Sequence, residues 1–138
     1  AILDLKCRDI VSFAIGKHNN NQLVFETFDL AIRKYPDAHP LFHSDRGFQY
    51  TSKQFKAKLD KQGMKQSMSR VGRCIDNGPM EGFWGILKCE MYYLNHFETY
   101  EELVAAVEQF IHYYNHKRRQ HKLNCMPPAT YRSLLEAA

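Results

Sequence analysis

The stretch RVGRCIDNGPMEGFWGILKCE, residues 70–90, joins a loop rich in Gly, Pro and Arg to an apolar helix, and it decides which fold the chain is expected to adopt. At about 100° per residue, one stripe of this helix is apolar and consists of Met80, Phe83, Trp84, Leu87, Met91 and Leu94. We expect the stripe to pack on a sheet, with Phe83 and Trp84 in the core. Glu81 lies in the first turn beside the stripe, where the core meets solvent.

The polar side of this helix carries two further signals. Lys88 follows Glu81 by seven residues, so that the two side chains lie nearly in line along the helix. Gly82 and Gly85 flank that line, although each is expected to weaken the helix by about 1 kcal/mol relative to Ala. We infer that something bulky approaches the helix on this side.

Strand and helix signals alternate along the rest of the chain. Strands are predicted within residues 1–16, 40–45 and 64–69, and helices within residues 20–35, 52–62, 99–115 and 127–138. Thr99 and Glu102 have the spacing of a capping box, and residues 46–52 are predicted to form a loop. This order indicates an α/β sandwich with helices on the sheet faces, and residues 1–138 are predicted to form one domain.

Asp45 is the natural partner for Glu81. It ends a predicted strand and precedes a loop that contains Gly, which is where an open α/β sheet places its ligand groups. Two carboxylates with few other ligands suit Mg²⁺ or Mn²⁺, and basic surroundings would direct the chemistry to phosphodiesters. The alternative is that both acids face solvent, as most acidic side chains do.

The basic residues are unevenly distributed in a chain whose net charge is +4. One cluster lies within residues 46–73 and a second, HKRRQHK, spans residues 116–122. Such clusters favour a polyanion such as DNA, while residues 53–61 alone are better explained as a solvated helix face. The candidate DNA contacts are Arg46, Arg70, Arg73, Lys88, Lys117, Arg118 and Arg119.

Composition excludes several classes of protein. With 44% hydrophobic and 25% charged residues the chain is typical of an ordinary globular domain. No apolar run is long enough for a membrane helix, and no signal peptide is recognisable, so a cytoplasmic location and no membrane partner are predicted. The four cysteines form no CxxC pair, which argues against a zinc ribbon or a disulfide scaffold.

Three motifs together resemble the catalytic domain of IS3-family insertion-sequence transposases, which are related to retroviral integrases. These motifs are HSDRGFQYTS, SMSRVGRCIDNGPMEGFWGILKCE and YYNHKRRQHKLNCMPPATYR. Thirty-five residues separate Asp45 from Glu81, as in that family's acidic triad, and a basic residue follows the Glu by seven positions, at Lys88.

The resemblance implies a fold, an activity and partners. The fold is RNase H-like, with a mixed five-stranded sheet and helices on both faces. Asp45 and Glu81 are implied to be the second and third members of an Asp-Asp-Glu triad that binds divalent metal ions, and Lys88 is implied to contact DNA. The activity is metal-dependent cleavage and transfer of DNA strands, carried out by a homo-oligomer assembled on DNA.

The first Asp of the triad is not found where the resemblance places it. In the family it belongs to a first strand before the hairpin that residues 1–16 resemble, so we expect this chain to be an N-terminally incomplete catalytic core from a longer polypeptide. A missing first strand would leave a gap in the sheet. Asp4 is the alternative candidate, and its competing interpretation is a position on the second strand.

Histidines offer two further candidate sites. His112, His116 and His121 include an i, i+4 pair that could bind zinc, although contact with DNA or solvent is favoured. His43 either lies near the metal ions or packs at the end of its strand. Two alternatives to a transposase stay open, a non-catalytic DNA-binding or assembly module and an RNase H-like nuclease.

Overall fold

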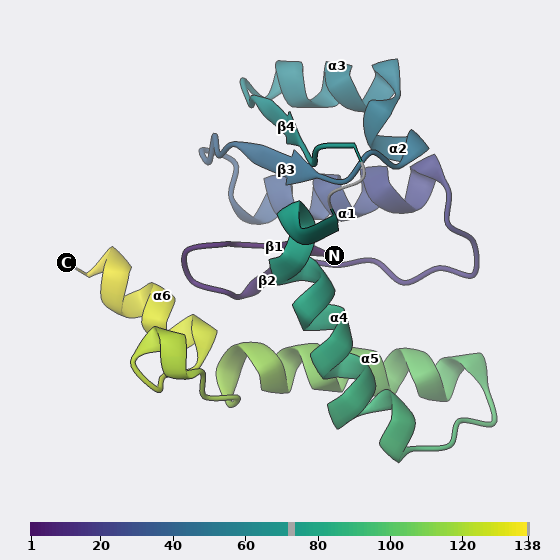
Figure 1. Ribbon diagram of the computed structural model, residues 1–138, viewed down its shortest axis with the longest axis vertical. Coiled ribbons are helices and arrows are strands. Elements are labelled where there is room, and N and C mark those ends of the chain that lie inside the picture. The colour runs from purple at the N-terminus through teal and green to yellow at the C-terminus, as the bar shows by residue number, and fades with distance from the viewer. Residues whose placement is uncertain (72–73, 138) are drawn as a thin grey trace. The chain divides into compact units, whose positions relative to one another are not determined.

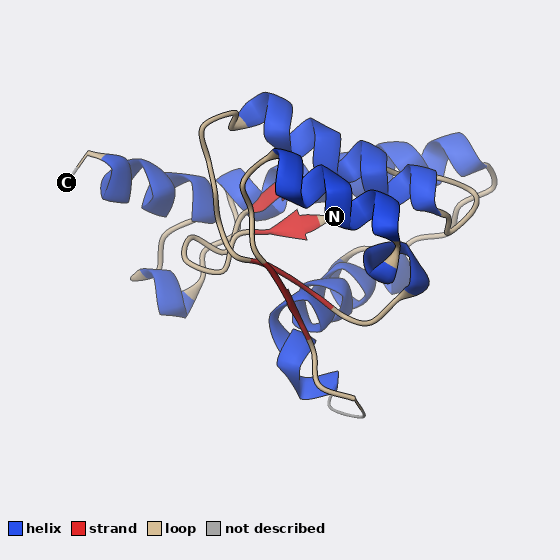
Figure 2. Ribbon diagram, turned by 90° about the horizontal axis from the view of Figure 1, so that it is seen from above, coloured by secondary structure: helices blue, strands red, loops and turns tan. Residues whose placement is uncertain are grey.

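The computed structural model describes residues 1–71 and 74–137, in which helix predominates over strand (Figures 1 and 2). The strands are β1 (Ile2–Leu3), β2 (Ile10–Ser12), β3 (Phe42–Ser44) and β4 (Gln66–Met68). The α-helices are α1 (Asn21–Lys34), α2 (Phe48–Thr51), α3 (Lys53–Lys61), α4 (Gly78–Glu90), α5 (Tyr100–His116) and α6 (Pro128–Glu136). Three short 3₁₀ helices are η1 (Cys74–Asn77), η2 (Tyr92–Leu94) and η3 (His121–Leu123). Two compact units, Ser12–Glu81 and Ala1–Val11 with Gly82–Ala138, are described separately below, and the single-domain division stays a prediction.

The unit Ser12–Glu81 is built on a parallel strand pair. β3 pairs with β4 so that Phe42 lies opposite Gln66 and Ser44 lies opposite Met68. The ladder continues one residue further, because the Ser69 amide donates to the Ser44 carbonyl oxygen at 2.9 Å. In Figure 1, α1, α2 and α3 gather around this pair. The strand predicted to finish at Asp45 is confirmed, with the carboxylate directly after its last residue.

Local capping explains where the helices of this unit begin and end. The side chain of Asn20 accepts from the Leu23 amide at 2.9 Å and starts α1, and Ser52 accepts from the Phe55 amide and starts α3. Gly63, with φ of 64°, adopts the left-handed conformation just after α3 ends. Both helices predicted here are therefore confirmed.

The loop predicted over residues 46–52 is wrong in part, because Phe48–Thr51 form the short helix α2. The Tyr50 and Thr51 amides both donate to the Gly47 carbonyl oxygen, at 3.0 and 3.2 Å. The Asp45 side chain accepts from the Gly47 amide and turns the chain sharply after β3, which is the local cause of this extra helical turn.

A cluster of aromatic rings forms the core of the unit Ser12–Glu81. Phe55 of α3 is 0% exposed and contacts Phe28 of α1 and Phe42 of β3, with ring centroids 5.5 and 5.3 Å apart. Phe25 and Tyr50 complete its surroundings at 6.1 and 5.5 Å. Phe55 thus joins three helices to the strand that leads to Asp45.

The second unit is largely helical, and its core lies between α4 and α5. Phe83 packs edge-on against Tyr114, with ring centroids 5.0 Å apart, so that α5 covers the α4 stripe that was predicted to pack on a sheet. Phe83 is buried as predicted, but Trp84 is 37% and Leu94 is 73% exposed, so their assignment to the packed stripe is wrong. α4 ends at Glu90, and Leu94 belongs to η2, where the helical periodicity no longer applies.

The last two helices begin as predicted. Thr99 caps α5 by accepting from the Glu102 amide at 3.1 Å, while the Glu102 carboxylate accepts from the Glu98 amide at 2.9 Å, one residue before the cap. α6 starts at Pro128, where a proline lacks only an amide that would be unpaired anyway. Among the residues that the structure describes, no helix combines the length and apolar character of a membrane span.

The described strands form two separate pairs, β1 with β2 and β3 with β4. A continuous five-stranded sheet is therefore absent from the described part of the chain, although the α/β character is confirmed. Each strand is only two or three residues long, so few ladder hydrogen bonds are available to extend either pair.

Asn115 of α5 takes the place of a strand partner for β2. Its Oδ1 accepts from the Ile10 amide at 2.8 Å and its Nδ2 donates to the Ile10 carbonyl oxygen at 2.9 Å, while Ile10 is 2% exposed. The amide side chain thus satisfies both backbone groups of a buried strand residue, which would otherwise be costly to desolvate.

Replacing Asn115 with Leu is expected to lower the free energy of unfolding by about 2 kcal/mol. The new side chain has a similar branched shape, but the Ile10 amide and carbonyl lose their hydrogen-bond partners. Urea unfolding followed by circular dichroism measures the difference. The control is His112→Leu, which changes a side chain on the exposed face of the same helix, α5. Asn124→Leu, at an exposed position beyond the helix, is less suitable because residue 124 has a positive φ. Equal stability of the Asn115 and His112 variants would contradict the prediction.

Candidate metal and DNA site

Asp45 is held in place by its own turn. Its Oδ1 accepts from the Gly47 amide at 2.8 Å, which fixes the carboxylate at the end of β3 while the side chain stays exposed. A Cβ added at Gly47 would lie 3.0 Å from that same oxygen and 3.0 Å from Oε1 of Gln49, so a larger residue here would crowd the Asp45 carboxylate. Burial first, and then the charge of Asp45, raise the pKa of Tyr50.

Glu81 lies in the first turn of α4, where the helix dipole favours a negative charge. Its side chain is exposed and has neither a hydrogen bond nor an ion pair with any described residue. A Cβ added at Gly78, Gly82 or Gly85 would meet nothing within 4 Å. No packing between described residues therefore explains these glycines, and the inference of a close external partner for this side of α4 stays a prediction.

Both carboxylates belong to the unit Ser12–Glu81. Neither has a cationic side chain paired with it among the described residues, and Oδ2 of Asp45 accepts no hydrogen bond there. Unpaired carboxylate oxygens are the ligands that Mg²⁺ and Mn²⁺ prefer, so the chemistry of the two side chains fits a hard divalent cation. Whether they bind one is a proposal.

A different acidic cluster lies in the unit that contains β1 and β2. One ligand atom from each of Asp4, Cys7 and Asp9 lies within 4.8 Å of the others. However, Arg132 of α6 reaches this cluster, with Nη2 3.1 Å from Oδ2 of Asp4 and 2.6 Å from Oδ1 of Asp9. One guanidinium therefore offsets part of the charge of the two carboxylates, and the arrangement is that of a structural ion-pair cluster.

Asp4 has a structural role of its own. It lies in the turn after β1, not on the second strand, and its Oδ1 accepts from the Lys6 and Cys7 amides at 2.7 and 2.9 Å. Burial raises the pKa of Asp4, but these backbone hydrogen bonds and the charge of Arg132 outweigh it, so that the pKa lies below its usual value. These contacts explain Asp4 as the residue that shapes the turn.

The basic candidates differ in how they are engaged. Lys88, Lys117 and Arg119 are exposed, and Arg46 is exposed while its Nε donates to the Ser69 carbonyl oxygen at 2.8 Å. Such side chains keep most of their donors for a ligand. Their contact with DNA stays a prediction.

Three other basic candidates are placed differently. Arg118 makes a bidentate ion pair with Glu90, at 2.6 Å between Nη2 and Oε1, and the hydrogen bonds from Arg118 lower the pKa of Glu90. Arg70 is paired with Asp76 at 2.8 Å. Arg73 lies outside the described residues.

The candidate histidines do not form a metal cluster among the described residues. His43 lies 3.0 Å from Oγ of Ser67 and 3.2 Å from Oγ of Ser69, which supports the interpretation as a packed strand-end residue. The rings of His112 and His116 lie 4.6 Å apart, but within the described chain no group of three potential ligands includes them.

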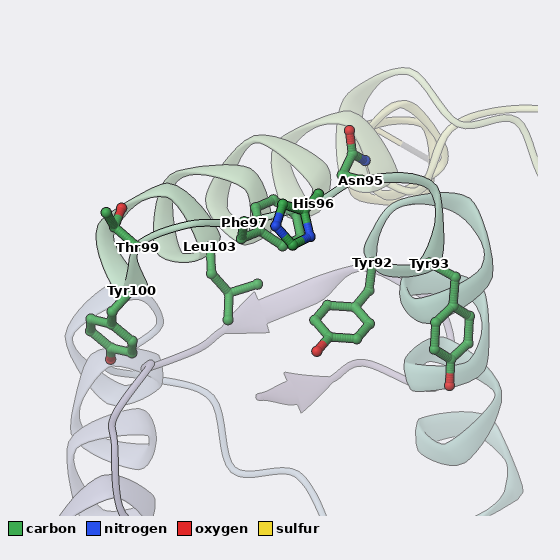
Figure 3. A pocket seen from close by; sticks show the side chains of 8 residues that line it. All are labelled: Tyr92, Tyr93, Asn95, His96, Phe97, Thr99, Tyr100 and Leu103. Carbon is green, nitrogen blue, oxygen red and sulfur yellow. The ribbon is translucent and has the colours of Figure 1, made fainter.

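An open pocket of about 550 Å³ lies in the second unit, between η2 and the start of α5 (Figure 3). Tyr92 and Tyr93 stand at one end and Tyr100 at the other. Its full lining is Tyr92, Tyr93, Asn95, His96, Phe97, Thr99, Tyr100 and Leu103. Neither Asp45 nor Glu81 contributes to it, and the aromatic run YYLNHFETY, residues 92–100, is the signal in the sequence that could have indicated this pocket.

One carboxylate directly follows a strand and a second lies in the first turn of a later helix, in a chain of α/β character, and this arrangement agrees with the family that sequence comparison identifies. The chain belongs to the integrase core domain family, whose models match residues 1–74 and 81–134. Its relatives include proteins named for insertion sequence elements, as the resemblance predicted.

Three relatives illustrate the similarity. A transposase-like protein of Haemophilus influenzae is 39% identical over 96% of this chain and 61% of its own length. A putative transposase for insertion sequence element IS150 of Escherichia coli K12 is 38% identical over 96% of this chain and 47% of its own length. A 31 kDa protein of insertion element IS600 from Shigella sonnei is 36% identical over 95% and 49%. The chain thus spans roughly half to three-fifths of these proteins. No solved structure matches it.

Proposed function

We propose that this chain is the catalytic domain of a DNA transposase, which cleaves DNA strands and transfers them in a metal-dependent reaction. The observation that carries the proposal is the pair of exposed, unpaired carboxylates, Asp45 and Glu81, in one compact unit of an integrase core domain. Asp45 is also held in one orientation at the end of β3 by its hydrogen bond from the Gly47 amide.

In this proposal each acidic residue has a defined task. Asp45 and Glu81 hold divalent Mg²⁺ or Mn²⁺ through carboxylate oxygens, with Asp45 already oriented by the Gly47 amide. When bound, such an ion supplies Lewis-acid stabilisation for the phosphodiester and activation of the attacking hydroxyl. Since no described residue pairs a cation with either carboxylate, both can bind a metal ion without first breaking such an ion pair.

The exposed basic residues then bind the DNA backbone. Lys88 shares its helix with Glu81, and Arg46 directly follows Asp45 in the sequence, so both accompany a catalytic carboxylate. Lys117 and Arg119 leave their charges unpaired among described residues, and Arg73 is proposed from sequence alone. Transposition joins two DNA ends, so the proposed working form is a homo-oligomer on DNA in the bacterial cytoplasm.

The test uses the polypeptide of native length that carries this chain, with duplex oligonucleotides ending in the element's own terminal repeats. In Mg²⁺ we expect nicked strands and joined products, and neither when EDTA removes the metal. DNA binding without any chemistry would identify a non-catalytic binding module instead. Cleavage without joining would identify a nuclease.

Removing the Lys117 and Arg119 side chains together is expected to weaken DNA binding uniformly across sequences. Each lost phosphate contact reduces the magnitude of the slope of log affinity against log salt concentration by about 0.9. In the double Ala variant this magnitude is therefore expected to fall by about 1.8. Fluorescence anisotropy over a salt series measures the slope. Lys56→Ala removes a lysine paired with Asp60 on an exposed helix face and is expected to leave it unchanged. An unchanged slope in the double variant would exclude these residues from the DNA interface.

A further inference from the structure

The end of β4 is fastened to β3 at several points. The Ser69 amide donates to the Ser44 carbonyl oxygen at 2.9 Å, and Nε of Arg46 donates to the Ser69 carbonyl oxygen at 2.8 Å. His43 adds a side-chain contact of 3.2 Å to Oγ of Ser69. Because Asp45 lies between Ser44 and Arg46, the residues on both sides of this carboxylate bind the segment that leads into residue 70.

From that fixed point, an ion pair reaches forward to α4. The Arg70 amide and Nε both donate to Oδ2 of Asp76 at 3.0 Å, and Nη2 donates to Oδ1 at 2.8 Å. Asp76 belongs to η1, which runs directly into α4 and its Glu81. The Asp76 side chain is only 19% exposed, although that of Arg70 is 65% exposed.

The protonation state of Asp76 suits this contact. The side-chain hydrogen bonds from Arg70, followed by the one from the Arg70 amide, hold the pKa of Asp76 well below its usual range. The carboxylate is therefore charged at neutral pH and accepts three donors from a single residue.

We propose that Arg70 and Asp76 are positioning residues, which fix the start of α4 to the end of β4 and so set where Glu81 stands relative to Asp45. This inference rests on the proposed function. It assigns Arg70 a role within the protein instead of the DNA contact that its charge alone predicted. An isolated surface ion pair adds little to stability, but here a backbone amide takes part and the bonds bridge the segment between β4 and α4, so the consequence is geometric.

The proposal depends on the ion pair between residues 70 and 76, and not on a positive charge at residue 70 alone. A DNA contact at residue 70 needs a cation there, whatever stands at residue 76. A positioning pair needs opposite charges at the two positions, in either order. Reversing the pair therefore separates the two roles.

The experiment compares Arg70→Ala, Asp76→Asn and the reversed pair R70D/D76R in the native-length protein. We expect each single change to lower the single-turnover rate of strand transfer by about 10- to 100-fold, with the Kd for DNA within about twofold. The reversed pair is expected to recover part of the rate, because it restores the side-chain ion pair but not the hydrogen bond from the amide of residue 70. Asp60→Asn, which breaks an exposed pair within α3, is the matched control and should behave as wild type. A weaker Kd for Arg70→Ala with no recovery on reversal would overturn the proposal in favour of DNA contact.

A second readout does not depend on activity. Hydrogen exchange of amides in residues 78–84 is expected to be about tenfold faster in Asp76→Asn than in wild type, because the start of α4 loses its tether, and to slow again in the reversed pair. Unchanged exchange would overturn the positioning role, whether or not the protein transfers strands. Wild-type inactivity with altered exchange in Asp76→Asn would instead refute the proposed function and leave the tether standing.

Discussion

Replacing Asp45 with Asn or Glu81 with Gln is expected to lower Mg²⁺-dependent strand transfer by on the order of 10³-fold. Both changes keep the size of the side chain and remove its charge. Asn at position 45 retains an oxygen that can accept from the Gly47 amide, so the turn after β3 is preserved. Glu81 makes no contact with another described side chain, so Gln at this position removes a ligand for the cation and nothing that holds the fold.

The control for Glu81→Gln is Glu101→Gln. Glu101 is likewise an exposed carboxylate in the first turn of a helix, so both changes remove the same favourable interaction with the helix dipole, worth about 0.5 kcal/mol. Strand-transfer rates at saturating DNA and thermal unfolding are measured for both. Loss of activity in both variants, or in neither, would show that Glu81 has no special part in the chemistry.

Replacing Asp9 with Asn is expected to lower the free energy of unfolding by about 3 kcal/mol. Asp9 is 4% exposed, and both of its oxygens accept from Arg132, at 2.6 Å from Nη2 and 3.2 Å from Nε. The variant leaves the partly buried guanidinium facing a neutral amide, and the single close carboxylate of Asp4 offsets less of the cost of desolvating its charge. The pair fastens α6 to the turn before β2.

Glu136→Gln provides a matched control for the same arginine. Glu136 is exposed and lies 3.8 Å from Nη1 of Arg132, so its removal is expected to cost less than about 0.5 kcal/mol. Urea unfolding at neutral pH compares the two variants with wild type. Similar costs for Asp9→Asn and Glu136→Gln would mean that burial does not strengthen the first pair.

The two proposed catalytic side chains depend on different kinds of support. Asp45 is held by a hydrogen bond within its own turn, from the Gly47 amide to Oδ1. Glu81 has no such local support, and its helix is tethered by Arg70 and Asp76. Substitutions outside α4, at Arg70 or Asp76, are therefore expected to displace Glu81.

Features that depend on neighbouring residues were visible in the sequence. The caps at Asn20, Ser52 and Thr99 and the strand before Asp45 are set by bonds between residues within one turn, and their spacing can be read directly. The family was also visible, because its three motifs are short and continuous. The expected Asp45 and Glu81 site followed from their spacing and stays a prediction.

Tertiary structure decided which distant residues contact each other. Arg132 is 123 residues from Asp9, and Asn115 is 105 residues from Ile10, so no local sequence pattern predicts either contact. The same holds for Trp84, whose helical phase was apolar but whose ring stays exposed because α5 covers the neighbouring Phe83. The sequence by itself determined the helices, their caps and the family, since these follow from bonds within a turn and from continuous motifs. Which charges are neutralised and which apolar side chains are buried depended on segments that meet only when the chain folds.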